Sequence, residues 1–353
     1  NVMIFGERDC SAQRRHQKVL EESPAPGLPE NVRTSLWAAA KGLASSVGYA
    51  NAGTCEFLYD EKKKQFYFLE MNTRLQVEHP VSEIVWGVDL PVLQLKIAQG
   101  EEISKEVLEA TPRGHAIEAR IYAEDPSKGY MPSPGKITDF YFPVAAGVRI
   151  DTGYEAGSEV PIFYDAMLAK VIAWGMTREE ARTKLLTTLE KSNVSGVLWN
   201  GKFLVDILKC PEFIKGSIYT KFLEEKFGNW KGSVRTEREG AVAATTTKEV
   251  ISPWFYYGSG KSPALKKSGT AAAASKTEDV VVGGPLISEY PGKILKLNVK
   301  VGDKVTKDQV VVVCESMKME YSYAAPLNTV VKAVHIKTGD IIKAGTLLVE
   351  WKD

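Results

Sequence analysis

The chain has 353 residues, with 45 basic and 44 acidic side chains and 44% hydrophobic residues. This composition is ordinary for globular proteins, and the length suggests two or three domains. The net charge of +1 argues against general binding to nucleic acid or to a membrane surface. The four cysteines stand far apart and form no Cys/His cluster, so neither a zinc site nor a disulfide framework is expected and a reducing compartment fits best.

No apolar run approaches the roughly 18 to 20 residues that would span a bilayer. We therefore expect a soluble protein without membrane contact. The first five residues, Asn1–Phe5, contain neither an initiator Met at position 1 nor the features of a signal peptide. They are typical of a strand entered midway, so we expect a fragment of a longer protein.

The first 228 residues mix strand and helix patterns. Residues 1–110 alternate the two, with a helix expected at Val32–Ala44 and a strand at Gln65–Met71. Residues 111–228 are expected to form a second α+β unit packed on the first. Its predicted strands are His115–Ala123 and Ala169–Ala173, and its predicted helices are Arg178–Lys191 and Gly201–Leu208.

Residues 229–279 have the composition of a flexible linker, rich in Ala, Thr, Ser, Lys and Gly. As a flexible coil, a segment of this length has an r.m.s. span of about 35 to 42 Å. We therefore expect the domain that follows to move relative to the preceding part of the chain. The aromatic run Trp254–Tyr257 is unusual in a solvated segment. It indicates either packing on this protein or docking of a partner.

The last 70 residues are all-β in character and contain an internal repeat at an offset of 37. Val299–Asp303 matches Ile336–Asp340, and Val310–Val312 matches Leu347–Val349. Each Gly-Asp pair between apolar runs is typical of a turn. Two such hairpin units that stack their apolar faces would form a small two-sheet sandwich with quasi-twofold symmetry.

One lysine stands between two methionines where the two copies of the repeat meet, in the sequence Glu-Ser-Met-Lys-Met-Glu of residues 315–320. An ordinary turn with a solvated lysine would explain this sequence if it stood alone. Its position between the repeats indicates more, and residues 280–353 resemble the biotinyl attachment domain of biotin-dependent carboxylases. The resemblance implies that Lys318 carries covalent biotin, added by a biotin protein ligase. The similar lipoyl domains typically have an acidic residue where this chain has Met317.

A second group of polar residues lies within Phe68–Pro80. Side chains alternate along a strand, so Glu70, Asn72 and Arg74 are predicted to share one face. A straight strand would carry Glu78 roughly 26 Å from Glu70, so we expect a bend after Arg74. Carboxylate and amide oxygens suit Mg²⁺ bound to phosphate, and an arginine guanidinium can donate two hydrogen bonds to an oxyanion. Surface ion pairs on an amphipathic strand are the alternative explanation.

This segment resembles the active-site strand of biotin carboxylase, and the resemblance covers residues 1–228. It includes the ordered segments Gly6–Ser11, Gln13–Lys18, Gly114–Arg120, Ala123–Pro126 and Tyr164–Lys170. It implies the C-terminal part of an ATP-grasp domain over residues 1–110 and a biotin carboxylase C-terminal domain over 111–228. The expected fold class is therefore multidomain: two α+β parts, then an all-β flattened sandwich of the biotinyl/lipoyl type over 280–353. The glycine-rich lid of that family is not found in residues 1–228, so we expect this chain alone to lack bicarbonate-dependent ATPase activity.

The resemblance also implies roles for single residues. Gln13 and His16 are expected to contact ATP, while Glu56, Glu70 and Asn72 are expected to hold Mg²⁺ or Mn²⁺. Bicarbonate is expected to bind Lys18, Arg74, Gln76, the backbone at Val77, and Glu78. The catalytic residues are then Lys18, Arg74, Glu78 and Arg120. Glu78 would be the general base that deprotonates bicarbonate for attack on the γ-phosphate of ATP, which gives carboxyphosphate, and Arg120 would stabilise the biotin enolate that attacks CO₂.

The chain is thus expected to be the biotin carboxylase and carrier parts of an acyl-CoA carboxylase of the acetyl- or propionyl-CoA type. The linker is too short for a further domain of roughly 100 residues, so the carboxyltransferase is expected on a separate subunit. The resemblance also implies a homodimer through the carboxylase region and a location in the cytoplasm or the mitochondrial matrix. The alternative is a non-catalytic biotin carrier with the carboxylase region as a scaffold.

Overall fold

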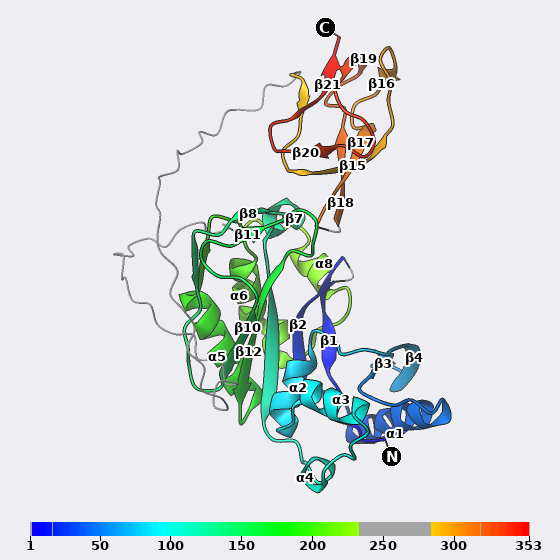
Figure 1. Cartoon of the computed structure of the whole chain (residues 1–353), viewed down its shortest axis with the longest axis vertical. Coiled ribbons are helices and arrows are strands. Elements are labelled where there is room, and N and C mark those ends of the chain that lie inside the picture. The colour runs from blue at the N-terminus through cyan, green and yellow to red at the C-terminus, as the bar shows by residue number, and fades with distance from the viewer. Residues whose placement is uncertain (1, 16, 233–283, 318, 353) are drawn as a thin grey trace. The chain divides into compact units, whose positions relative to one another are not determined.

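The computed structural model describes residues 2–15, 17–232, 284–317 and 319–352 (Figure 1). These residues divide into two compact units. The first is made of residues 2–130, 137–158 and 167–232, and the second of residues 131–136, 159–166 and 284–352. Most of the predicted linker, including Trp254–Tyr257, lies outside the described residues, as do His16 and Lys318.

A five-stranded antiparallel sheet is the centre of the first unit (Figure 1). Its strands, in spatial order, are β1 (Asp9–Arg14), β2 (Gln17–Ser23), β5 (His115–Tyr122), β12 (Met167–Gly175) and β10 (Val148–Thr152). The strands predicted at 115–123 and 169–173 are confirmed as β5 and β12. The buried residues Ile117, Ala119 and Ile121 alternate along β5, which shows that one face of the sheet carries the apolar core.

Helices cover both faces of this sheet. α5 (Arg178–Lys191) packs on β5 and β12, and α6 (Gly201–Lys209) packs on α5, which confirms both predicted helices. α5 begins where the Thr177 side chain accepts a hydrogen bond from the Glu180 amide at 3.2 Å, an N-cap that satisfies one free helix amide. On the opposite face α2 (His79–Trp86) packs on β2, β5 and β12. Its contact is a small apolar cluster of Val81, Val85, Ala116 and Ile172.

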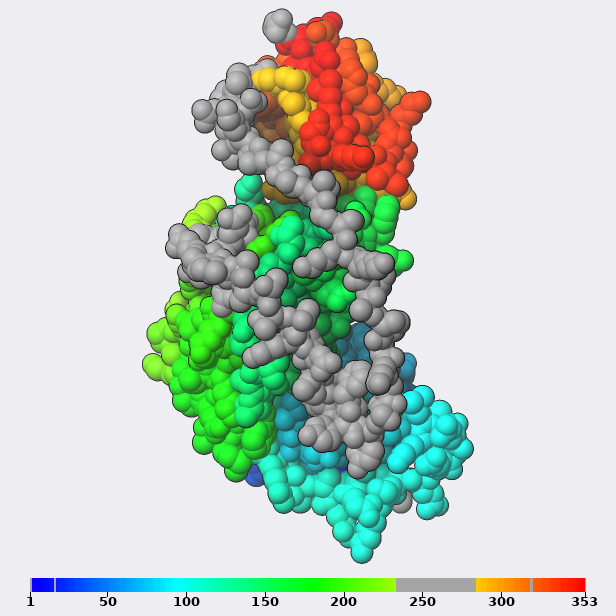
Figure 2. Space-filling view, turned by 60° about the vertical axis from the view of Figure 1, so that its left-hand side comes forward, coloured from blue at the N-terminus to red at the C-terminus, as the bar shows by residue number. Residues whose placement is uncertain are grey.

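A hairpin and a long helix precede α2. α1 (Glu30–Ser46) extends the predicted helix by a few residues at both ends, and β3 (Thr54–Asp60) pairs with β4 (Gln65–Asn72), the strand predicted at 65–71. In Figure 2 the cyan residues of α3 (Leu90–Ala98) and α4 (Lys105–Leu108) project from the surface of this unit. The remaining short elements of the unit are β6 (Glu124–Asp125), η1 (Pro126–Lys128), β9 (Asp139–Tyr141), β13 (Asn193–Ser195), α7 (Pro211–Lys215) and α8 (Phe222–Phe227).

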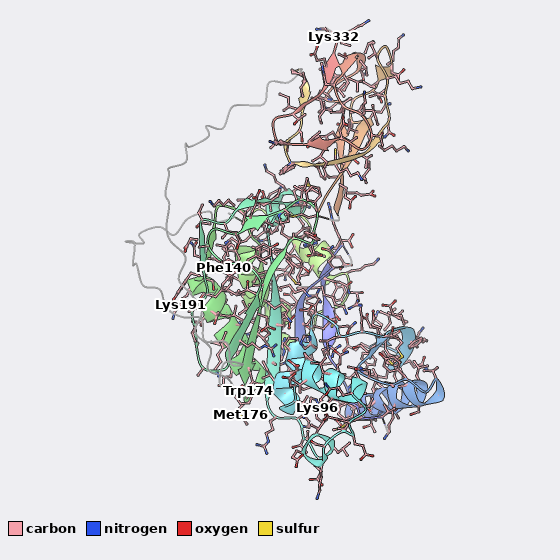
Figure 3. The ribbon with its side chains drawn as sticks, viewed as in Figure 1. Lys96, Phe140, Trp174, Met176, Lys191 and Lys332 are labelled. Atoms are coloured by element: carbon pink, nitrogen blue, oxygen red, sulfur yellow. The ribbon has the colours of Figure 1, made fainter. Side chains whose placement is uncertain are left out.

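Trp174 lies near the C-terminal end of β12 and is labelled in Figure 3. Its indole nitrogen donates to the Arg113 carbonyl at 3.0 Å, and its ring packs against the apolar cluster under α2. The indole N–H therefore has a hydrogen-bond partner, while the ring is half-buried against the apolar cluster.

The second unit contains two four-stranded sheets. One has the order β14 (Leu286–Ile287), β21 (Leu347–Trp351), β19 (Thr329–Val334) and β16 (Lys304–Val305). The other has the order β18 (Met319–Ala324), β17 (Val310–Ser316), β15 (Gly292–Leu297) and β20 (Ile341–Ile342). Three further short strands of this unit are β7 (Met131–Pro132), β8 (Gly135–Lys136) and β11 (Glu159–Val160).

The 37-residue repeat is the symmetry of this sandwich. β19, β20 and β21 each begin 37 residues after β15, β16 and β17, and each strand of one sheet has its counterpart in the other. The turns repeat as well: Asp303 accepts from the Lys300 amide at 2.8 Å, and Asp340 accepts from the Lys337 amide at 2.7 Å. Val311, Val331 and Leu348 are fully buried between the sheets. The flattened sandwich predicted from the repeat is thus confirmed.

Within the described part of the chain, no helix is both long and apolar enough to cross a membrane.

Candidate active site

The chain turns sharply between β4 and α2. β4 ends at Asn72, and α2 begins at His79 with Glu78 as its N-cap and Pro80 in its first turn, a position that proline favours. The bend predicted after Arg74 is therefore present. It brings Glu78 back to the polar face of the β3–β4 hairpin.

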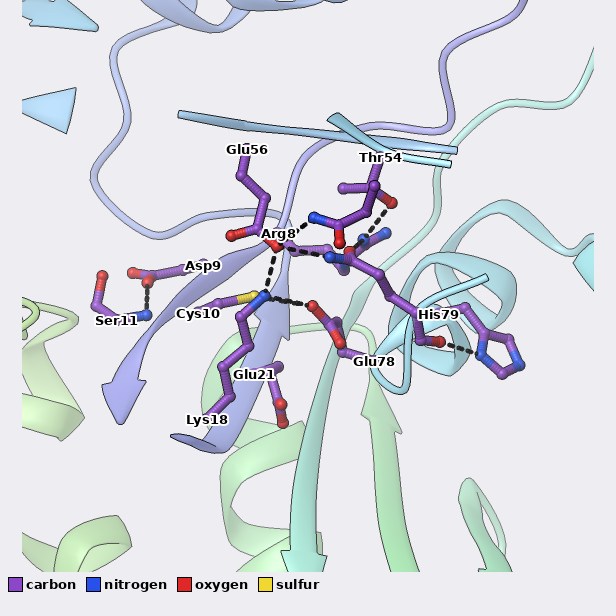
Figure 4. A network of polar contacts seen from close by, with 12 residues as sticks. Arg8, Asp9, Cys10, Ser11, Lys18, Glu21, Thr54, Glu56, Glu78 and His79 are labelled. Atoms are coloured by element: carbon purple, nitrogen blue, oxygen red, sulfur yellow. Dashed lines mark hydrogen bonds and ion pairs between the residues drawn. The ribbon is translucent and has the colours of Figure 1, made fainter. Parts of the chain in front are cut away.

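Glu78 lies at the centre of a network of polar contacts (Figure 4). Its Oε1 accepts from Lys18 Nζ at 2.7 Å, and its Oε2 accepts from a terminal nitrogen of Arg120 at 3.0 Å. The Glu78 side chain is only 2% exposed. Each oxygen of one buried carboxylate therefore faces a different cation.

Two neighbouring strands of the sheet, β2 and β5, carry these cations. Lys18 on β2 pairs with Gln13 on β1, and Arg120 on β5 pairs with Lys170 on β12. Strict alternation would place Lys18 and Glu21 on opposite faces of β2. The register shifts between Ala12 and Gln13, and such an irregularity turns side chains away from strict alternation. Lys18 and Glu21 consequently reach the same cluster.

Two carboxylates and an amide gather on the β3–β4 hairpin. Glu56 and Glu70 are directly opposite in the strand register. The Asn72 amide donates to Glu56 at 3.2 Å and to Glu70 at 3.0 Å. Glu56 also accepts from Lys18 at 3.0 Å and from Gln76 at 2.6 Å. Like charges directly opposite each other are unfavourable unless a cation joins them.

This hairpin set fits a hard divalent cation, because it offers two facing carboxylates and a side-chain amide. The Asn72 amide nitrogen faces the two carboxylates in this structure, so its oxygen would turn toward a bound cation. In the described residues, no group of three or more His, Cys, Asp or Glu side chains is arranged to hold a metal. A cation here would thus take its remaining ligands from water or phosphate oxygens, as Mg²⁺ commonly does.

The charges of the network fix its protonation states. Burial raises the pKa of Glu78, but Arg8, Lys18 and Arg120 outweigh the burial and lower it to about 2. Burial lowers the pKa of Lys18, and the neighbouring acids, Glu78 among them, raise it by more. Glu78 is therefore a carboxylate and Lys18 an ammonium at neutral pH.

A second layer of acids lies beneath Arg120. Glu21 accepts from Arg120 Nε at 2.5 Å, and Glu118 is directly opposite Glu21 in the register. Both acids are at most 1% exposed. Burial raises the pKa of Glu21 to about 7 despite Arg120, and burial together with Glu21 raises the pKa of Glu118 well above its ordinary value. Arg120 is thus held between a carboxylate in the site and an acid pair behind it.

The other predicted residues are less tightly held. Arg74 is exposed and donates to Asn72 at 3.4 Å and to the Leu75 carbonyl at 3.2 Å, whereas Gln13 is half-buried beside Lys18. His16 and Lys318 lie outside the described residues, but the strands that flank Lys318 pair as far as Ser316 and Met319.

Sequence analysis missed the residues that hold the site from behind. Arg8 donates to Gln76 at 2.6 Å and to Thr54 at 3.1 Å, and it contributes to the charge around Glu78. Asn200 accepts from the Tyr122 amide at 2.9 Å and donates to the Arg120 carbonyl at 3.0 Å, which fixes the end of β5. The only signal for Arg8 in the sequence is its place in Gly6–Ser11, a segment that resembles biotin carboxylase.

Three family profiles match the chain in order. Residues 1–106 match "Carbamoyl-phosphate synthase L chain, ATP binding domain", residues 118–225 match "Biotin carboxylase C-terminal domain", and residues 281–351 match "Biotin-requiring enzyme". The chain belongs to the biotin-dependent carboxylases.

Curated relatives and solved structures agree with this family. The chain is 48% identical over 226 residues to the methylcrotonoyl-CoA carboxylase subunit alpha of Arabidopsis thaliana, which covers 64% of this chain and 31% of that protein. It is 46% identical over 228 residues to the biotin carboxylase of Pseudomonas aeruginosa, which covers 65% of this chain and 50% of that protein.

A solved structure with a similar fold is the biotin carboxylase domain dimer of the Hydrogenobacter thermophilus 2-oxoglutarate carboxylase, in complex with MgADP, ADP and bicarbonate. The TM-score is 0.62 at 40% identity, with 65% of this chain and 50% of that chain covered. This biotin-dependent carboxylase chain thus spans between about a third and a half of the length of the relatives it matches.

Proposed function

We propose that this chain supplies the bicarbonate-activating part of a biotin carboxylase and the carrier that receives the carboxyl group. The complete subunit would carboxylate biotin on Lys318 at the expense of ATP and pass the carboxyl group to a carboxyltransferase. The observation that carries the proposal is the buried Glu78 carboxylate held between Lys18 and Arg120. A surface ion pair has no need of such burial.

In this proposal Glu78 removes the proton of bicarbonate. A carboxylate with a pKa of about 2 is a weak base while its cations are directed at it alone. Bound bicarbonate gains a second negative charge as it loses its proton, and Lys18 and Arg74 then stabilise that charge. The cations that lower the pKa of Glu78 in the free site thereby favour proton transfer in the occupied site.

Glu56, Glu70 and Asn72 would hold Mg²⁺, which neutralises phosphate charge during transfer from ATP. Lys18, Gln76 and the Val77 backbone would bind bicarbonate, with Arg74 free to swing onto it because it is exposed. Gln13 and His16 would contact the nucleotide. Arg120 would stabilise negative charge on the ureido oxygen of biotin, since its guanidinium is fixed by Glu21 and Glu78.

The carrier role rests on the quasi-symmetric sandwich. Lys318 lies in the sequence between β17 and β18, whose pairing ends at Ser316 and Met319. A biotin protein ligase would attach biotin there. The match of residues 118–225 to the biotin carboxylase C-terminal domain, on the same chain as the carrier match over 281–351, supports biotin over lipoate.

The acyl acceptor and the assembly are further proposals. We propose an acyl-CoA acceptor of the acetyl- or propionyl-CoA type, bound by a separate carboxyltransferase subunit, although the relatives include carboxylases named for methylcrotonoyl-CoA and 2-oxoglutarate. The Hydrogenobacter domain is described as a dimer, which supports a homodimer through the carboxylase region. A location in the cytoplasm or mitochondrial matrix fits both kinds of relative.

Phosphate release from ATP tests the proposal. The complete subunit, incubated with free biotin, is expected to release phosphate only when bicarbonate and Mg²⁺ are present. Release that does not depend on bicarbonate, or no release, would favour a non-catalytic carrier with the carboxylase region as a scaffold.

A further inference from the structure

Two backbone carbonyls in the turn between β4 and α2 accept hydrogen bonds from side chains that are not among the proposed bicarbonate ligands. Lys170 Nζ donates to the Val77 carbonyl at 2.9 Å. His79 Nδ1 lies 2.7 Å from the Gln76 carbonyl, and because a carbonyl only accepts, this nitrogen carries the proton. Lys170 is the last residue of Tyr164–Lys170, one of the segments that resemble biotin carboxylase.

These two contacts fix both peptide planes that flank Val77. Both peptides are trans, so in each the C=O and N–H bonds point in opposite directions. A Gln76 carbonyl directed at His79 turns the Val77 amide to the opposite side. A Val77 carbonyl directed at Lys170 fixes the next plane. Among the described residues the Val77 amide has no hydrogen-bond partner, which leaves it available as a donor.

Lys170 is itself anchored. The register aligns it with Asp151 on β10, and the two side chains form an ion pair at 3.3 Å. Asp151 accepts from Arg149 through both oxygens, at 2.7 and 2.9 Å, and Arg149 reaches Glu83 of α2 at 2.7 Å. Lys170 is only 12% exposed. This chain of charge-assisted contacts ties the sheet to the helix that the turn begins.

We propose that Lys170, together with His79, is a positioning residue that directs the Val77 amide toward bicarbonate. A preorganised backbone donor loses little on binding, because its orientation is already fixed. The Val77 amide lies in the peptide that His79 holds, and Lys170 holds the next peptide. The two planes meet at the Val77 Cα, so without Lys170 the turn loosens and the donor moves away from the bicarbonate site. The inference rests on the proposed function, since it concerns the same anion.

The test uses the complete biotinylated subunit and steady-state kinetics. Lys170→Met is expected to raise the KM for bicarbonate about 10-fold, while the KM for ATP changes less than about twofold. Lys170→Arg retains a cationic donor and is expected to recover most of the loss. Lys184→Met is the matched control, because Lys184 Nζ donates to a different backbone carbonyl, that of Trp174, at 3.1 Å. It is expected to leave both constants unchanged.

Asp151→Asn supplies a second route if Lys170→Met does not fold. It leaves Lys170 in place but weakens its anchor, and a smaller rise in the bicarbonate KM is expected. An unchanged bicarbonate KM in a folded Lys170→Met or Asp151→Asn variant would overturn the inference while leaving the proposed function intact. A parallel rise for bicarbonate and ATP would also overturn it, because that pattern indicates general damage. Wild-type subunit without bicarbonate-dependent phosphate release would overturn both proposals.

Discussion

Replacing Glu78 by Gln removes the charge around which the candidate site is arranged. Lys18 and Arg120 each lose their contact to the Glu78 carboxylate, at 2.7 and 3.0 Å, but keep those to Glu56 and Glu21. The substitution changes the side-chain volume little. The expected consequences are a less stable carboxylase unit and the loss of bicarbonate activation. The two can be measured separately.

The size of the stability effect follows from the pKa of Glu78. The three neighbouring cations, after the opposing effect of burial, lower this pKa from 4.5 to about 2. At about 1.4 kcal/mol per pH unit, this corresponds to roughly 3 kcal/mol of unfolding free energy. A depressed pKa stabilises the fold fully above the unfolded value near 4.5, and the contribution is lost as pH falls toward 2.

Urea unfolding of the 353-residue chain, followed by tryptophan fluorescence, measures this difference. Glu78→Gln is expected to lose about 3 kcal/mol at pH 7, and its difference from wild type is expected to shrink below pH 4.5. Glu109→Gln is the matched control: Glu109 is 67% exposed, is paired with Lys105 at 3.6 Å, and this substitution is expected to change stability by less than about 0.5 kcal/mol.

In the complete subunit Glu78→Gln is expected to lower bicarbonate-dependent turnover about 10²- to 10⁴-fold. Equal stabilities of wild type and Glu78→Gln at pH 7 would refute the charge argument, and retained turnover would refute the role as base.

Three further predictions follow from the same network and the carrier. Arg120→Ala is expected to slow carboxylation of biotin more than bicarbonate-dependent ATP cleavage, because the first chemical step needs no biotin; equal losses in the two assays would place its role earlier. Burial raises the pKa of Glu21 to about 7, so wild type is expected to lose unfolding free energy as pH rises from about 4.5 to 7; Glu21→Gln should remove this part of the pH dependence, and an identical profile would contradict it. Lys318→Arg is expected to abolish labelling by biotin, ATP and a biotin protein ligase, and peptide mass mapping that still finds biotin would withdraw the assignment.

Local sequence patterns predicted the features that depend on residues close together in the sequence. The helix Arg178–Lys191 has an N-cap threonine before it and a lysine in its last turn, and the structure has the same bounds. The 37-residue offset gave the symmetry of the sandwich because each repeat is one hairpin unit. The bend after Arg74 followed from distance alone, since Glu78 cannot share a site with Glu70 along a straight strand.

Long-range contacts were harder to predict. The sequence does not say that β2 lies beside β5, so the pairing of Glu21 with Glu118 and the two-sided support of Arg120 were not foreseen. Strict alternation would place Lys18 and Glu21 on opposite faces of β2. The register shift between β1 and β2 lets both side chains reach the cluster around Glu78. Lys170 contacts a carbonyl 93 residues away, and no local pattern encodes such a partner.

Transfer of labelled carbon tests the central claim most directly. The complete subunit, biotinylated and supplied with ATP, Mg²⁺ and ¹⁴C-bicarbonate, is expected to carry label on the peptide that contains Lys318. This label should depend on ATP and should be nearly absent in Glu78→Gln. A biotinylated wild-type subunit that acquires no label, or a Glu78→Gln subunit that acquires it as fast as wild type, would contradict the account.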